Sequence, residues 1–181
     1  MRGQAIFAVS LFACACDLGE AHEPGENLGM FDVVATMSDS TCGAGALKAP
    51  AVWEFEVKLV RDGSVLYWVN GTRYIPGEFA SDGVTFTFTA STQVTLFEPT
   101  IQRPGCVITR LDSALGVLTE GAPDIEGTGA TENSFTGTLS YGYLAGQDGD
   151  CTDAVGVEGG FSTLPCEITY DLVAKVPKSE E

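Results

Sequence analysis

Histidine and basic residues are scarce in this chain of 181 residues. Nine Lys and Arg face 25 Asp and Glu, so the net charge is −16, and the single histidine is His22. His22 lies among acidic residues and glycines, where we expect it to be exposed to solvent. This position argues against Ser-His-Asp and Cys-His catalytic arrangements. The negative charge repels phosphate groups, so we do not expect the protein to bind nucleic acid.

Motifs that bind phosphate, nucleotides or zinc are also missing. The sequence contains no glycine-rich phosphate loop, no Gly-X-Gly-X-X-Gly and no His-Glu-X-X-His. It contains no Cys-X-X-Cys pair, and its one histidine is remote in sequence from the later cysteines. We therefore expect no cofactor.

Long apolar runs are absent as well. The longest is residues 5–13, preceded by a short segment carrying Arg2, whereas a membrane-spanning helix needs about 20 apolar residues. We therefore expect no membrane-spanning segment. A basic start, a short apolar run and small residues after it are the layout of a signal peptide, which we assign to residues 1–15.

Two cysteines, Cys14 and Cys16, each follow an alanine at the end of this apolar run. The pattern resembles the lipobox of bacterial lipoproteins. That resemblance implies a diacylglyceryl thioether on the cysteine, cleavage before it, N-acylation of the new terminus, and a membrane anchor in the cell envelope, facing the periplasm or the cell surface. An ordinary secretory signal that merely contains cysteines is the alternative.

Counting cysteines favours Cys16 over Cys14 as the lipidated residue. Cleavage before Cys16 leaves an even number of further cysteines, namely Cys42, Cys106, Cys151 and Cys166. Lipidation of Cys14, which has a leucine three residues before it, leaves one thiol unpaired in an oxidising compartment.

After the signal peptide we expect three regions. Residues 16–29 are acidic and poor in apolar side chains, which predicts a flexible tether. Residues 30–176 form a β-domain, and residues 177–181 a polar C-terminal tail.

The β-domain is predicted from a period of two in its apolar residues. We expect all-β architecture, a single antiparallel β-barrel or β-sandwich of about nine strands with two disulfides. The expected strands are residues 30–37, 52–60, 64–70, 84–90, 93–97, 106–111, 116–120, 134–144 and 167–176. In the last of these, Ile168, Tyr170, Leu172 and Ala174 are expected to face inward.

The four cysteines of the domain allow three connectivities. Proximity in sequence favours Cys151–Cys166, which leaves Cys42 to pair with Cys106 across the domain.

Several residues are candidates for binding or chemistry. Asp148, Asp150 and Asp153 surround a glycine turn and offer oxygen ligands to Ca²⁺, but they depart from the twelve-residue calcium-loop pattern, so a bare acidic turn is favoured. A carboxylate hydrolase could use Glu54, Glu56 or Asp171, although these occupy outward strand positions. An aromatic ligand surface could form, or the same rings could pack in the core; they are Tyr67, Trp68, Tyr74, Tyr141 and Tyr143.

The sequence therefore predicts a membrane-anchored envelope lipoprotein that is not an enzyme. Its β-domain is expected to bind a small molecule, a glycan or an envelope protein. The alternatives are a structural surface protein without a specific ligand, and a hydrolase.

Overall fold

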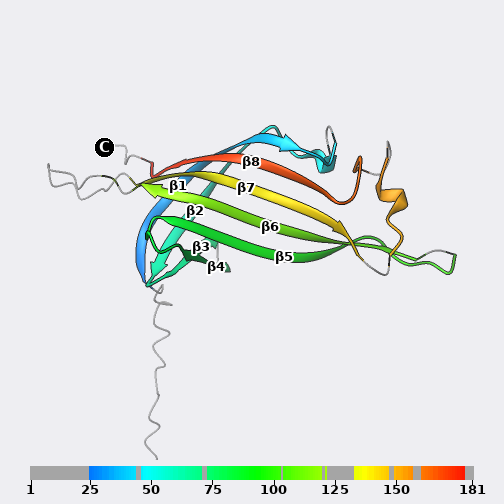
Figure 1. The fold of residues 1–181 in the computed structure, drawn as a ribbon, viewed down its shortest axis with the longest axis horizontal. Coiled ribbons are helices and arrows are strands. Elements are labelled where there is room, and N and C mark those ends of the chain that lie inside the picture. The colour runs from blue at the N-terminus through cyan, green and yellow to red at the C-terminus, as the bar shows by residue number, and fades with distance from the viewer. Residues whose placement is uncertain are drawn as a thin grey trace, which may run out of the picture.

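A computed structural model describes residues 25–43, 46–70, 73–102, 104–119, 121, 133–146, 149–156 and 160–177. Its fold is a closed antiparallel barrel in which eight strands are neighbours in sequence order (Figure 1). The strands are β1 (Glu26–Ser40), β2 (Val52–Asp62), β3 (Val65–Asn70), β4 (Arg73–Phe79), β5 (Thr85–Phe97), β6 (Cys106–Thr119), β7 (Ser134–Ala145) and β8 (Cys166–Lys175). Two 3-10 turns accompany them, η1 (Ala46–Lys48) and η2 (Thr152–Ala154). The prediction of an all-β barrel or sandwich is confirmed, and the structure is the barrel.

The alternating pattern places one face of each strand in the barrel interior. On β8, the side chains of Ile168, Tyr170, Leu172 and Ala174 are buried as predicted, and the residues between them are exposed or half-buried. The first and last strands pair with each other, with Asp32 opposite Lys175 at one end of the ladder. This pairing closes the barrel around a core of aliphatic and aromatic side chains.

The prediction of about nine strands differs from the observed eight for two reasons. The two strands expected at 84–90 and 93–97 correspond to one strand, β5, which begins at Thr85, and the two expected at 106–111 and 116–120 correspond to one strand, β6, whose described part ends at Thr119. The missed strand is β4, where Pro76 and Gly77 suggest a turn. Pro76 is tolerated because its nitrogen faces the β5 side, where β4 pairs only through Gly77–Phe79, so no ladder hydrogen bond is lost. Gly77 is needed because a Cβ there would lie 2.4 Å from the Phe88 ring.

The N-terminal boundary also differs from the prediction. Strand β1 begins at Glu26, so the last residues of the predicted tether already pair with β2.

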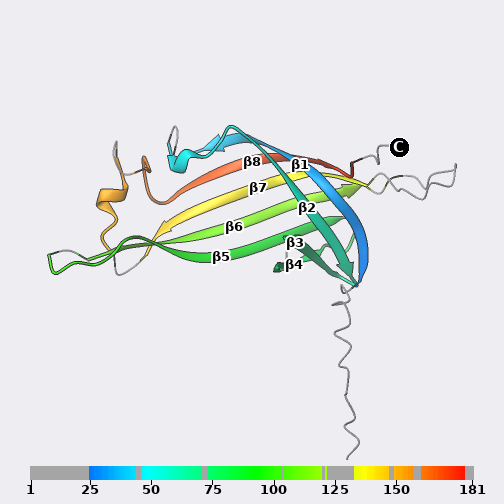
Figure 2. The same cartoon turned by 180° about the vertical axis from the view of Figure 1, so that it is seen from behind.

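The wall of the barrel is uneven, because β3 and β4 are short and their neighbours are long (Figure 2). Strand β3 pairs with β2 only from Lys58 to Asp62. Strand β4 pairs with β5 only through Gly77–Phe79. The first half of β2 and the second half of β5 therefore face each other across a gap in the described ladder, which we call the lateral opening.

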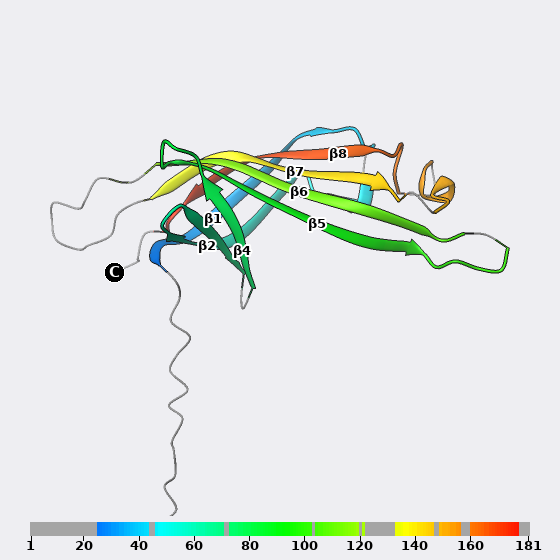
Figure 3. The same cartoon turned by 60° about the horizontal axis from the view of Figure 1, so that its bottom comes forward.

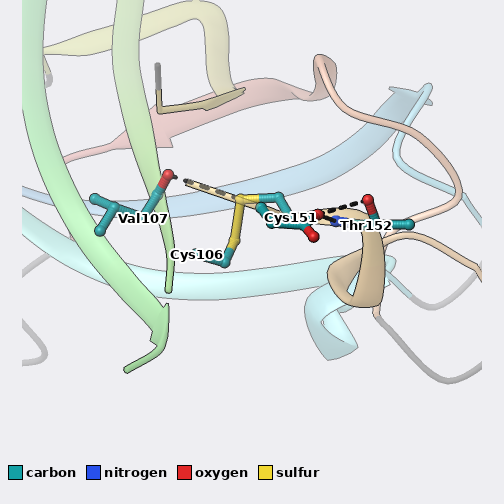
Figure 4. Close-up of a disulfide and its surroundings, with 5 residues drawn as sticks. Cys106, Val107, Cys151 and Thr152 are labelled. Atoms are coloured by element: carbon teal, nitrogen blue, oxygen red, sulfur yellow. Dashed lines mark hydrogen bonds between the residues drawn. A yellow bond between two sulfur atoms is a disulfide. The ribbon is translucent and has the colours of Figure 1, made fainter. Parts of the chain in front are cut away.

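Both predicted disulfide pairings are wrong. The bonds join Cys42 to Cys166 and Cys106 to Cys151, with Cα–Cα distances of 4.9 Å and 4.8 Å. Figure 4 shows the second bond beside Val107 and Thr152. The observed pairing follows from the order of the strands in the barrel. Strand β1 ends beside the start of its neighbour β8, and β6 begins beside the chain that follows β7.

The two disulfides fasten one end of the barrel. The described parts of the chain between β7 and β8, including η2, lie at this end (Figure 3), where Phe161 is buried with its ring 5.4 Å from that of Tyr143. The amide of Ser162 donates a hydrogen bond to the carbonyl of Cys42. The chain enters β1 and leaves β8 at the opposite end.

Candidate ligand cavity

A cavity of about 400 Å³ lies at the lateral opening and reaches into the barrel. Its lining comes from six strands, β2 through β7, so residues far apart in sequence meet there. The aromatic lining residues are Trp53, Phe55, Trp68, Phe88 and Tyr141. The charged lining residues are Glu56, Arg110 and Asp112.

The aromatic residues form one continuous wall. The rings of Trp53 and Phe55, two residues apart on β2, have centroids 4.5 Å apart. Phe55 on β2 stacks on Trp68 of the neighbouring strand β3, with ring centroids 5.8 Å apart and an interplanar angle of 22°. The ring of Phe88 packs edge-on against that of Trp68, with ring centroids 5.7 Å apart. Both tryptophans of the chain belong to this wall, which offers extended apolar faces to a ligand.

The polar part of the cavity is an ion pair on β6. The Nε and Nη2 groups of Arg110 each donate a 2.7 Å hydrogen bond to one carboxylate oxygen of Asp112. The hydrogen bond to Asp112 raises the pKa of Arg110. Since a guanidinium carries five N–H donors, about three remain for other partners, and Asp112 keeps free lone pairs. The pair therefore offers donors and acceptors together, with no net charge.

Tyr141 lies beside the ion pair in the cavity lining. The guanidinium carbon of Arg110 lies 5.5 Å from the centroid of the Tyr141 ring. Burial and, after it, the charge of Asp112 raise the pKa of Tyr141 to about 12. The hydroxyl thus keeps its proton over the physiological range and can act as donor or acceptor.

The aromatic residues singled out in the sequence are divided between three environments. Trp68 and Tyr141 line the cavity. Tyr143 is buried in the core against Phe161, and Tyr67 and Tyr74 pack edge-on against each other at 6.1 Å. Core packing therefore holds for Tyr143, whereas the position of Trp68 and Tyr141 in a cavity leaves the ligand surface a prediction.

Sequence reasoning missed Arg110 and Asp112 as site residues, along with Trp53, Phe55 and Phe88 as cavity lining. A signal for the ion pair existed: alternation along β6 places Arg110 and Asp112 on the same face as buried Ile108 and Ala114. The expected break between residues 111 and 116 concealed this continuity.

The candidate carboxylates are distributed over the barrel. Glu54, Glu56 and Asp171 are all exposed, and of the three Glu56 lines the cavity. The second carboxylate of the cavity is Asp112, whose two oxygens are engaged by Arg110.

The acidic turn before η2 shows local hydrogen bonding. Asp150 Oδ1 accepts hydrogen bonds from the amide and the hydroxyl of Thr152, at 3.0 and 2.6 Å. Asp148 lies outside the described residues, as do Cys14, Cys16 and His22. Among the residues that the structure describes, no three His, Cys, Asp or Glu are grouped so that they could hold a metal ion. Within the same ranges, no helix has the length and apolar character needed to cross a membrane.

Comparison with known proteins found no matching family model, no matching curated protein and no matching solved structure. The geometry of the cavity is therefore the basis for assigning a function.

Proposed function

We propose that this protein is a membrane-anchored envelope lipoprotein whose barrel binds a small amphipathic molecule in the cavity at the lateral opening. The observation that carries this proposal is the aromatic wall of Trp53, Phe55 and Trp68 in the same cavity as the Arg110–Asp112 pair. Pockets of this size with apolar walls and a few fixed polar groups are typical of small-molecule sites.

The lining defines the chemistry of the ligand. A flat apolar or aromatic body fits the wall, and hydroxyl, amide or amine groups fit the ion pair. Anionic ligands are disfavoured, because Asp112 neutralises Arg110 and the whole chain carries a net charge of −16.

Two features support the proposed location in the cell envelope. The four cysteines of the domain are joined in two disulfides, a form that persists in oxidising compartments. The predicted signal peptide and lipobox supply the route of export and the anchor at Cys16.

Ligand binding can be tested with the uncharged aromatic probe N-phenyl-1-naphthylamine. We expect saturable quenching of tryptophan emission with a rise in probe emission, because both tryptophans line the cavity. Ala90→Phe places a ring in the cavity lining and should weaken probe binding by about tenfold or more. Thr87→Phe, on the exposed face of the same strand, should bind as the parent protein does. No saturable quenching, or equal binding by Ala90→Phe, would refute the cavity as a ligand site.

The anchor can be tested by expressing the full chain in a bacterium and measuring the mass of the mature N-terminus. We expect cleavage before Cys16 and a lipid-modified cysteine there. Cys16→Ser should release the protein from the membrane fraction, whereas Cys14→Ser should leave it anchored. A mature product with an unmodified N-terminus would contradict the lipoprotein assignment, independently of the result for the cavity.

A further inference from the structure

The second half of β5 has an open edge. Strand β5 pairs with β6 along nearly its whole length, from Thr85 to Phe97. On its other side it pairs with β4 only through Phe86, Thr87 and Phe88. Residues 89–95 are all exposed, and no strand among the described residues pairs with them on that side.

The direction of the backbone groups on this edge follows from two hydrogen bonds. The carbonyl of Val84 accepts from the amide of Leu118 on the β6 side, and the carbonyl of Thr85 accepts from the amide of Ala80 on the β4 side. Since the groups alternate along a strand, Ser91, Gln93 and their odd-numbered neighbours direct N–H and C=O to the open edge. The even-numbered residues bond to β6.

This edge lacks the usual protection against strand pairing. Exposed edges normally carry charged side chains, proline or a bulge. Strand β5 contains no charged residue, no proline and no glycine, and its register shifts only between Thr95 and Phe97. By contrast, the edge of β2 across the lateral opening exposes Glu54 and Glu56.

We propose that residues 89–95 of β5 bind an extended, positively charged segment of another polypeptide, which adds to the barrel as a further strand. Backbone hydrogen bonds to β5 would supply affinity, and alternate side chains would enter the neighbouring cavity, which Thr89 and Ala90 also line. The strand site borders the proposed small-molecule cavity and shares Thr89 and Ala90 with it, but strand addition does not require a small molecule to be bound.

Charge selects the partner. A strand added to β5 lies in the lateral opening near Glu56, which lines the same cavity as Thr89 and Ala90. A segment bearing lysine or arginine is attracted there. A second copy of this chain would bring another charge of −16 and is repelled.

The test uses a peptide of alternating lysine and valine, about eight residues long and capped at both ends. Binding is measured by calorimetry, and its location by hydrogen exchange of the full protein. We expect slower exchange of the amides of Ser91 and Gln93. Slower exchange confined to β2, or association of the protein with itself through β5, would overturn the proposal.

Two variants separate strand addition from simple charge attraction. Gln93→Pro removes an N–H that points to the open edge and leaves the β6 ladder intact, so binding should fall by about tenfold or more. Gln93→Ala keeps the N–H and should bind within about twofold of the parent protein. Equal binding by both variants would refute strand addition.

Changes in the peptide test the same point without altering the protein. N-methylation of alternate residues blocks one peptide edge at constant charge and should abolish binding. A glutamate–valine peptide should not bind either. Full binding of the methylated peptide would show charge attraction alone, and full binding of the glutamate peptide would refute the charge selection.

Discussion

Replacement of Cys42 and Cys166 by serine is expected to lower the free energy of unfolding by about 5 kcal/mol. The bond joins residues 124 positions apart, so it restricts nearly the whole domain in the unfolded state. For a domain of this size the loss corresponds to a fall in Tm of about 15 °C. Chemical denaturation and calorimetry without reductant measure both values.

The second disulfide provides the matched control. Cys106 and Cys151 are 45 positions apart, so their replacement should cost less, about 4 kcal/mol. A digest without reductant should yield a peptide linking Cys42 to Cys166. A linkage of Cys151 to Cys166, or a larger loss for the shorter loop, would contradict the observed pairing.

Phe86→Ala is expected to lower the free energy of unfolding by about 3 to 5 kcal/mol, a large loss for a single substitution. Phe86 is buried at the centre of an aromatic cluster, with ring centroids of Phe88 and Phe135 5.7 and 5.5 Å away. Its ring also rests on Gly116, where an added Cβ would lie 2.2 Å from it. Urea denaturation monitored by circular dichroism measures the loss.

Two further substitutions serve as controls for Phe86→Ala. Phe86→Leu keeps most of the volume and should cost less than half as much. Tyr74 is 40% exposed, so Tyr74→Ala should change the free energy of unfolding by less than about 1 kcal/mol. A similar loss at Tyr74 and Phe86 would refute a core centred on Phe86.

Local patterns in the sequence were sufficient for the strand class but not for the neighbours of each strand. Period-two alternation identified the inward residues of β8 because that signal depends only on the strand itself. The disulfides depend on which strands meet when the barrel closes, and β1–β8 pairing is invisible to local sequence. Proximity in sequence therefore favoured Cys151–Cys166 wrongly.

The cavity was hidden for the same reason. Trp53 and Trp68 were both recognised as strand residues, but their meeting with Asp112 requires β2, β3 and β6 to be placed around one interior. Strand β4 was missed because Pro76 and Gly77 are unfavourable in most strands. Only the tertiary structure explains them, since Pro76 has no partner in β5 and Gly77 lies in tight contact with the Phe88 ring.

Because the antiparallel barrel has an even number of strands, β1 begins and β8 ends at the same end of it, which bears on the proposed lipid anchor. The chain begins β1 at the end of the barrel opposite both disulfides. If Cys16 carries the proposed lipid, that end would lie toward the bilayer and the disulfide-fastened end would project into the aqueous space. The cavity and the second half of β5 lie toward the projecting end, since Trp53 lies near the start of β2 there and β5 finishes there at Phe97. Ligands and partner chains would thus approach from the solvent side, unobstructed by headgroups.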